Sequence, residues 1–191
     1  MKGDILKAAL KMNDIARNIR KKRFENGSMS FERSKARFKL DENHYPIEIE
    51  PEVRKESCFM VEEYMLLANK FVGQFIVNTC EEIGVLRCHP PPNKNKIGIL
   101  EGILNRLNLK MEFDSSKAIQ ESSNKIFQDE KVPKVHKVIL KSKMCKILEA
   151  ARYFVVEFTP KEDWAHFALS FDVYTHFTSP IRYILNYFLN S

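Results

Sequence analysis

The sequence predicts an α+β fold that is mainly helical, with a short β-hairpin and additional antiparallel strands. Apolar residues recur at helical spacing over several long segments, and the stretch Ile47-Glu48-Ile49-Glu50 alternates strictly, as a half-buried strand does. The chain has no internal repeat and no low-complexity tract, and its 191 residues are enough to enclose one hydrophobic core. We therefore expect residues 1–191 to form a single unit.

Helical periodicity predicts a first amphipathic helix over residues 4–25, which begins near Asp4 and stops at Gly27. A second helix is predicted over residues 56–83, and its broad apolar face predicts burial against several neighbours. Further helices are predicted over residues 97–108, 117–127 and 134–150, and a last helix is predicted to start at Ser179-Pro180.

The segments Phe38–Leu40 and Ile47–Ile49 are predicted to pair as a β-hairpin across a turn at Asp41-Glu42-Asn43. Pro46 and Pro51 flank the second arm, and because proline cannot donate to a strand ladder, this arm should be short or lie at an edge. Other strands are predicted over residues 110–113, 153–158 and 168–175.

The charge balance allows a polyanionic partner without requiring one. The chain has 31 Lys and Arg residues against 25 Asp and Glu residues, a net charge of +6, which suits either nucleic acid or a solvated surface with a small excess of lysine. No apolar run reaches about 18 residues and no signal peptide is evident, so we expect no membrane contact and an intracellular location. The four cysteines are widely spaced, which predicts reduced thiols rather than disulfides or a zinc site.

The stretch from Tyr174 to Arg182 carries the strongest chemical signal in the chain. It holds threonines, a serine, a histidine and an arginine, and its proline can start a helix. Hydroxyl groups, the N–H groups of a helix start and a guanidinium are the groups that hold a phosphate. Helix capping explains Ser179 and Pro180 equally well, and both roles can hold at once.

Four segments resemble the ribonuclease II (RNB) family of exoribonucleases in their order and spacing. The two specific ones read VEEYMLLAN and YTHFTSPIR, and neither helical nor strand periodicity explains them. The resemblance covers about residues 5–182 and implies the middle-to-late part of an RNB catalytic domain. The segments are Val61–Asn69, Leu86–Pro92, Ala151–Phe154, and His166–Leu169 followed by Tyr174–Arg182.

The tract Met111–Ser116 and the region around Met144-Cys145 are most similar to the exosome-independent eukaryotic branch of this family. That branch is cytoplasmic and favours RNA with uridylated 3′ ends. The resemblance therefore implies a cytoplasmic location and a single-stranded RNA partner, with no DNA and no membrane partner expected.

The resemblance also implies roles for individual residues. Arg182 is similar to the family's catalytic arginine at the scissile phosphate, where a guanidinium stabilises developing charge; the alternative is a solvated arginine at a helix start. Glu63 is similar to the glutamate near the RNA 3′ end, which can accept from a ribose hydroxyl; the alternative is a solvated helix face. RNA binding is also expected at His176, Thr178 and Ser179.

Two further residues are interpreted through the same resemblance. Phe31 lies roughly where bacterial relatives carry an aromatic ring that stacks on RNA bases, and the alternative is an ordinary core phenylalanine. Asn69 is expected to have a structural role, although it belongs to the VEEYMLLAN segment.

Other parts of the family pattern are absent from the sequence. There is no aspartate-rich segment of the kind that holds the family's Mg²⁺, Tyr183 stands where relatives carry a second arginine, and no cold-shock or S1 domain flanks the chain. We therefore expect a segment of a hydrolytic, Mg²⁺-dependent 3′→5′ exoribonuclease that is inactive as this isolated chain and has the missing remainder of the RNB domain as a partner. Two alternatives stay open: a non-catalytic module that binds single-stranded RNA, and a helical interaction protein with a vestigial resemblance.

Overall fold

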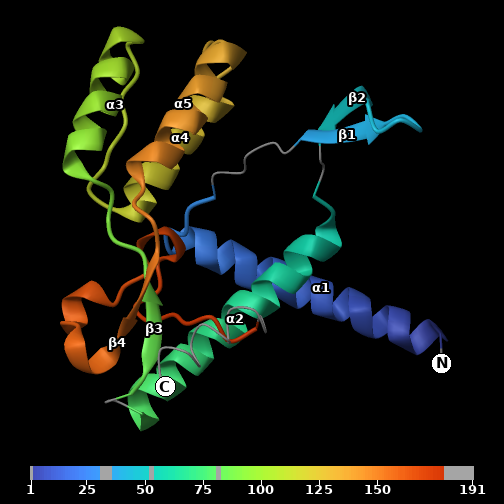
Figure 1. Ribbon diagram of the computed structural model, residues 1–191, viewed down its shortest axis with the longest axis vertical. Coiled ribbons are helices and arrows are strands. Elements are labelled where there is room, and N and C mark those ends of the chain that lie inside the picture. Colours follow the sequence, from blue (N-terminus) through green and yellow to red (C-terminus); the bar gives the residue numbers. More distant parts are fainter. Residues whose placement is uncertain (1, 31–35, 52–53, 81–82, 179–191) are drawn as a thin grey trace.

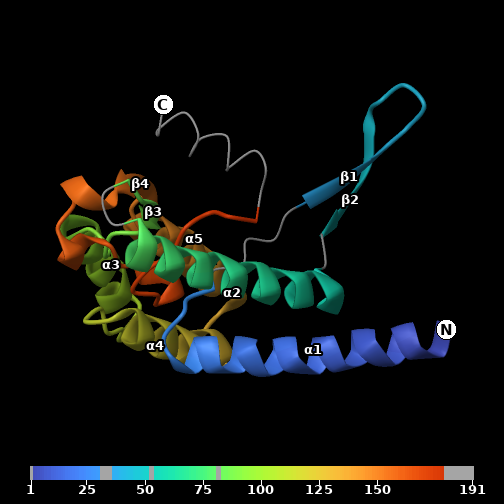
Figure 2. The ribbon, with the colours of Figure 1, turned by 90° about the horizontal axis from the view of Figure 1, so that it is seen from below.

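The computed structural model describes residues 2–30, 36–51, 54–80 and 83–178, and it confirms a mainly helical α+β fold. Helices α1 (Lys2–Glu25) and α2 (Glu56–Thr79) cross and pack against each other, while three shorter helices form a bundle beside them (Figures 1 and 2). The other elements are β1 (Ala36–Leu40), β2 (Pro46–Pro51), β3 (Val85–Cys88), α3 (Lys94–Arg106), α4 (Ser116–Gln128), α5 (Lys134–Ile147) and β4 (Arg152–Val155). The hairpin of β1 and β2 projects away from the helices (Figure 2).

Helix α1 ends at a glycine turn, as the sequence predicts. Gly27 has a φ of 96°, and the Ser28 N–H donates to the Arg23 carbonyl at 3.1 Å, which closes the last turn of the helix. The next N–H, that of Met29, donates to the Ala168 carbonyl at 2.8 Å. The end of α1 is therefore tied to a segment near the other end of the described chain.

Helix α2 buries polar side chains and leaves much of its apolar face uncovered. Its buried residues are Glu63, Asn69 and Gly73, whereas Phe71 and Phe75 are 58% and 63% exposed. The prediction that its apolar face is buried against several neighbours is therefore wrong for the described part of the chain. The physical reason is that the surfaces facing α2 present arginines and backbone N–H groups, which require polar partners.

The hairpin confirms the predicted pairing. Strands β1 and β2 run antiparallel, with Phe38 opposite Ile49. The Asp41 carboxylate accepts hydrogen bonds from the N–H groups of Asn43 (2.9 Å) and Tyr45 (2.8 Å), which fixes the predicted turn.

Strand β3 is an element that the sequence analysis missed. It pairs antiparallel with β4, from Val85 opposite Val155 to Cys88 opposite Arg152. The predicted strand over 153–158 is correct only up to Val155, after which the chain forms a 3-10 turn. A four-residue strand has too little alternation to be recognised, and the prolines after Cys88 indicate a loop instead.

The bundle of α3, α4 and α5 encloses the main hydrophobic core. The Ser115 hydroxyl caps α4 by accepting from the Ala118 N–H at 3.1 Å, and the Asn93 side chain caps α3. These caps start both helices at the points where their apolar faces meet. The buried core residues are Met29, Leu100, Leu104, Ile119, Ile126, Val132, Leu140, Met144 and Ile147.

Two segments predicted as strands are irregular. Residues 110–113 turn their large apolar side chains toward the bundle core, and the Glu112 N–H donates to the Ser122 hydroxyl at 3.3 Å instead of to a strand. Residues 168–175 contain the end of a 3-10 turn and a left-handed Ser170, because their backbone groups bond to several different elements. The prediction of strands there is therefore wrong.

All four cysteines are free, as the sequence predicts. In the described residues, no helix combines the length and the apolar character needed to cross a bilayer. The helix predicted from Ser179-Pro180 lies outside the described residues.

Alanine at two glycine positions should have opposite effects on stability. A Cβ on Gly27 would lie 2.9 Å from Lys117 Cβ at a positive φ, whereas a Cβ on Gly102, within α3, would meet nothing within 4 Å. We expect Gly27→Ala to lower the free energy of unfolding by about 1–2 kcal/mol and Gly102→Ala to raise it by about 0.5–1 kcal/mol. Urea denaturation measures both, and a stabilised Gly27→Ala protein would contradict the glycine turn.

Candidate nucleic-acid interface

The segment Tyr174–Thr178 lies beside α2, and one side chain of that helix holds its backbone (Figure 2). The side-chain oxygen of Asn69 accepts hydrogen bonds from the N–H groups of Phe177 (2.9 Å) and Thr178 (3.0 Å). The side-chain nitrogen of Asn69 donates to the Tyr174 hydroxyl at 3.0 Å. Asn69 is 2% exposed, so water does not compete for these three bonds. The stretch with the strongest chemical signal is thus anchored on α2.

Strand β3 contacts the same segment. The Arg87 N–H donates to the Tyr174 carbonyl at 2.7 Å, and the Thr175 hydroxyl donates to the Val85 carbonyl at 3.0 Å. On α2, Gly73 lets the segment come close, since a Cβ there would lie 3.3 Å from the Tyr174 carbonyl carbon. The segment is therefore fixed by contacts with both a helix and a strand.

His176 belongs to a cluster of aromatic rings. Its Nδ1 lies 2.5 Å from the Tyr153 hydroxyl. The ring of Tyr174 stands edge-on to His176 and to His166, with centroids 5.6 and 5.2 Å apart, and His166 stacks on His89 at 5.2 Å. One ring nitrogen of His176 is thus engaged by protein, while the residue remains half-buried rather than enclosed.

Two imidazoles of this cluster are neutral because they are buried. Burial, helped by the neighbouring His89, lowers the pKa of His166 to about 3, and burial also lowers the pKa of His89. The Nδ1 of His166 has no hydrogen-bond partner among the described residues. Across the described ranges, no group of three His, Cys, Asp or Glu side chains could hold a metal ion. We interpret the rings as a packing unit that supports the segment.

Glu63 lies deep between α1 and α2, where two arginines take up its carboxylate. It is 1% exposed. Arg23 binds it through two bonds, Nε to Oε2 at 2.9 Å and Nη2 to Oε1 at 2.6 Å, and Arg20 donates to Oε1 at 3.1 Å. A bidentate arginine–carboxylate pair of this kind is strong and geometrically specific. The carboxylate therefore faces α1, and its expected ribose contact stays a prediction.

The same charged network continues toward the surface. Glu62 accepts hydrogen bonds from Arg20 at 3.3 Å and from Arg54 at 2.8 Å. Both guanidinium groups also lie over the ring of Phe59, 4.2 and 4.6 Å from its centroid. The arginines near the start of α2 are thus held in place by carboxylates and by an aromatic face.

A groove of about 640 Å³ runs along α2 between these charges and the anchored segment. Arg54 and Glu62 line it together with Asn69 and Tyr174, and apolar side chains such as Val61 lie among them. A groove that combines a cation, apolar walls and an aromatic residue suits a single-stranded nucleic acid, whose phosphates and bases need these different contacts.

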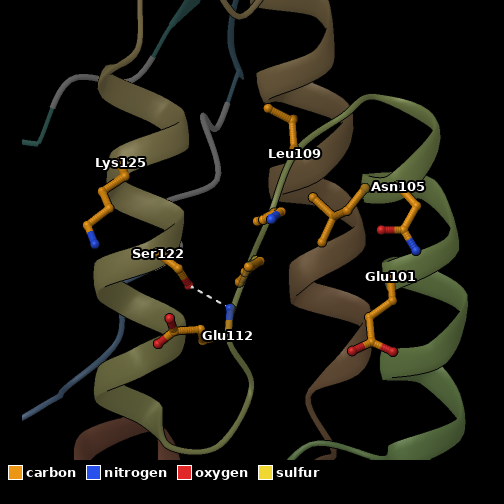
Figure 3. Close-up of a pocket in the computed structure, with 9 residues that line it drawn as sticks. Glu101, Asn105, Leu109, Glu112, Ser122 and Lys125 are labelled. Atoms are coloured by element: carbon orange, nitrogen blue, oxygen red, sulfur yellow. Dashed lines mark hydrogen bonds between the residues drawn. The ribbon is translucent and has the colours of Figure 1, made fainter.

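A second pocket, of about 650 Å³, lies at the bundle (Figure 3). Glu101 and Asn105 project from α3, Ser122 and Lys125 from α4, and Glu112 from the chain between these helices. None of its lining residues belongs to the anchored segment Tyr174–Thr178, whereas Tyr174 lines the groove on α2. We therefore place the candidate site on α2 and not at the bundle.

The structure brings together only some of the residues expected to form the site. His176 and Thr178 share the anchored segment, and the buried Thr178 hydroxyl oxygen has no hydrogen-bond partner within the described ranges. Glu63 lies on the same helix as Asn69 but faces α1. The predicted site residues that lie outside the described residues are Phe31, Ser179 and Arg182.

Sequence reasoning missed the residues that position this site. Arg23 and Tyr153 have no local pattern that reveals their partners, which lie 40 and 23 residues away along the chain. Asn69 and Glu63 did offer a signal, since each is a polar residue within an apolar helical stretch. A polar side chain in such a setting is often a buried and paired one.

Comparisons with known proteins agree on one family. The family model described as "RNB domain" matches residues 2–184. Two Arabidopsis thaliana proteins, named inactive exonuclease DIS3L2 and DIS3-like exonuclease 2, are each 35% identical over 181 residues. The matches cover 94% of this chain and 17% of each relative, so the chain spans less than a fifth of their length.

A solved structure gives the same result for the fold. Mycoplasma genitalium RNase R in complex with ribose-methylated single-stranded RNA matches with a TM-score of 0.80 and 25% identity. The match covers 97% of this chain and 28% of that chain.

Replacing the buried carboxylate should cost more stability than replacing an exposed one. Glu63→Gln leaves the buried Arg23 without a counter-charge, and we expect a loss of about 3 kcal/mol in the free energy of unfolding. The control is Glu56→Gln, since Glu56 pairs with Arg17 at 2.6 Å on an exposed surface, where an ion pair contributes little. Urea denaturation of both variants is the test, and equal midpoints would contradict the buried pair.

The neutral His166 should make the protein less stable in mild acid. Its pKa is about 3 when folded and 6.5 when exposed, so below 6.5 only the unfolded state gains the proton. The free energy of unfolding should therefore fall by about 1.4 kcal/mol for each pH unit below that value. His166→Gln should make this slope shallower between about pH 6 and about pH 5, above the carboxylate range, while His89, whose pKa burial also lowers, keeps part of it. The exposed His44→Gln is the control, and an unchanged slope in His166→Gln would contradict this origin.

Proposed function

Since the chain belongs to the RNB domain family, we propose that it forms part of the RNA-holding wall of a 3′→5′ exoribonuclease. The observation that carries this proposal is the anchored segment Tyr174–Thr178, which leads directly into the string that ends at Arg182. The RNA complex of the similar RNase R structure supports an RNA partner. By the resemblance to the exosome-independent branch, the substrate is single-stranded RNA with a uridylated 3′ end, degraded in the cytoplasm.

The groove along α2 is the path that we assign to the RNA strand. Arg54 supplies a positive charge at one end, and Tyr174 and Asn69 form the other end, next to the anchored segment. Apolar side chains between them can contact bases without regard to sequence. RNA that follows this groove arrives at Asn69 and Tyr174, which hold the segment that carries Thr178.

Each residue that the sequence analysis expects at the RNA has a role in this proposal. Arg182 neutralises the scissile phosphate, and Thr178 and Ser179 donate hydroxyl groups to phosphate oxygens. His176 contacts the strand from the same segment, where its Nδ1 bonds to the Tyr153 hydroxyl. Phe31 stacks on a terminal base.

The role of Glu63 in this proposal starts from its contacts with α1. Its carboxylate is bound by Arg20 and Arg23. Oε2 accepts only the Arg23 bond among those that the structure gives, so a ribose hydroxyl could also donate to it once the buried carboxylate becomes accessible. We therefore propose that Glu63 mainly holds these two arginines in place, and that any ribose contact follows RNA entry.

Proteins hold Mg²⁺ with one or two carboxylates together with water and substrate phosphates. The described part of the chain contains no group of three acidic, His or Cys side chains that could hold a metal ion. We propose that the metal ligands of the complete enzyme come from the remainder of the RNB domain.

A partner that covers α1 is also part of this proposal. Ile5, Leu6 and Leu10 on the first half of α1 are each more than half exposed. Exposed apolar stripes of this kind mark protein contacts. We propose that the remainder of an RNB domain packs on this stripe.

One observation favours a second candidate function, a module that holds RNA without cutting it. A relative that is 35% identical is named an inactive exonuclease. A nuclease assay with Mg²⁺ and a uridylated single strand tests the second candidate against a chain that cuts RNA by itself. We expect no mononucleotide release from this chain alone, and robust release would refute the non-catalytic candidate.

The proposal predicts salt-dependent binding of RNA that requires Arg182. A fluorescent single strand ending in uridines should bind the 191-residue chain, and its affinity should fall as KCl is raised, because phosphate contacts release counterions. Arg182→Ala should weaken binding about tenfold and lower the slope of the salt dependence by about one. Fluorescence anisotropy measures both quantities.

The control for this experiment is Arg106→Ala, which removes an exposed arginine from the C-terminal end of α3. We expect its affinity to match that of the unmodified chain. No binding by the unmodified chain, or equal loss in both variants, would overturn the proposed RNA wall. A DNA strand of the same sequence should bind more weakly, since it lacks the 2′-hydroxyl.

A further inference from the structure

We infer that Asn69 is a positioning residue, whose buried side-chain amide sets the backbone of Phe177 and Thr178 and through it the RNA-binding end of the segment. The inference rests on the proposed function for its consequence in RNA binding. Its structural part, the clamp on two N–H groups, stands on the geometry alone.

The orientation of the Asn69 amide follows from its partners. Two backbone N–H groups face one side of it and can bond only to the oxygen, so the nitrogen must face the Tyr174 hydroxyl. The reversed amide would place its NH₂ group against two donors. One side chain therefore satisfies three groups, which no apolar residue of the same size can do.

This clamp takes the place of the hydrogen bonds that a neighbouring strand would provide to the N–H groups of Phe177 and Thr178. Residues 174–178 are not in a strand, and the N–H groups of Phe177 and Thr178 have Asn69 as the acceptor given by the structure. A buried N–H without an acceptor costs about 1–3 kcal/mol. Because a single oxygen accepts both bonds, the two peptide units are fixed relative to each other and to α2.

Neighbouring contacts limit the movement of the clamp itself. Tyr174, which receives the Asn69 nitrogen, is 4% exposed and also accepts from the Arg87 N–H through its carbonyl. Gly73 keeps the segment within van der Waals distance of α2. The clamp is therefore a rigid link between α2 and Thr178.

Thr178 is the residue whose position depends most on this link. Its N–H is bound to Asn69, while its hydroxyl oxygen is buried and has no hydrogen-bond partner among the described residues. Asn69 and Tyr174 also line the groove that we assign to RNA. Losing the clamp should therefore displace Thr178 and the end of the segment beside the groove without altering the groove's charge.

The test combines hydrogen exchange with RNA binding by the 191-residue chain. Asn69→Ala should lower the exchange protection of the Phe177 and Thr178 amides about tenfold, while amides in α4 and α5 keep theirs. Asn69→Asp should largely restore protection, because a carboxylate accepts both N–H bonds and the Tyr174 hydroxyl can donate to it. The control is Asn78→Ala, an exposed asparagine on the same helix, which should leave both amides unchanged.

RNA affinity separates this inference from the proposed function. If the unmodified chain binds a uridylated strand, Asn69→Ala should weaken that binding about fivefold or more at a temperature where the variant stays folded. Loss of protection with unchanged affinity would overturn the positioning role. If the unmodified chain binds no RNA, the proposed function fails. The clamp is then still tested by the exchange protection of the Phe177 and Thr178 backbone amides.

A milder variant keeps the test decisive should Asn69→Ala fail to fold. Tyr174→Phe removes only the hydroxyl that anchors the Asn69 nitrogen. It should lower protection of the Phe177 and Thr178 amides about threefold. Unchanged protection in this variant would show that the Asn69 side chain holds the two backbone N–H groups without the Tyr174 hydroxyl. That result would overturn the clamp as described.

Discussion

The pairing of buried polar groups on α2 is the constraint on which the rest of the structure depends. One side of the helix places Glu63 against Arg20 and Arg23 of α1, and another places Asn69 against the backbone of residues 174–178. Leaving a buried carboxylate or amide without its partner destabilises the fold by more free energy than a new surface contact adds. These hydrogen bonds are also directional, so they fix the register of α1 and of the segment on α2 more closely than apolar packing would.

Elements whose conformation is determined by local chemistry could be predicted from the sequence. Gly27 provides the positive φ that ends α1, and Asp41 supplies the acceptor that shapes the hairpin turn. Strand β3 could not be predicted, since its four residues are extended only because β4 pairs with them from a distant part of the chain. The error over residues 168–175 has the same origin: their composition favours a strand, but their backbone groups bond to the end of α1 and to β3 instead.

In the site, too, the features that depend on neighbouring residues could be predicted, and those that depend on distant residues could not. The string from Tyr174 to Arg182 directed attention to the segment that the structure finds anchored, because its residue types belong together chemically. The anchor itself was interpreted only as structural, since the Asn69 side chain and the Tyr174 hydroxyl lie 105 residues apart. For Glu63 the sequence offers the family resemblance and a helix face, and nothing in it identifies Arg23 as the group that binds the carboxylate.

The distribution of apolar residues gives these polar contacts their functional meaning. Helix α2 buries Glu63 and Asn69 while Phe71 and Phe75 stay exposed, which is the reverse of what an independent unit in water would adopt. Apolar faces tolerate small shifts of a partner, whereas a clamp with three hydrogen bonds does not. If further protein covers the exposed faces, as we propose, that contact can supply binding energy without disturbing the segment. The position of Thr178 would then be set within this chain by Asn69, and the contribution of the remaining domain would be stability and the groups that α2 does not provide.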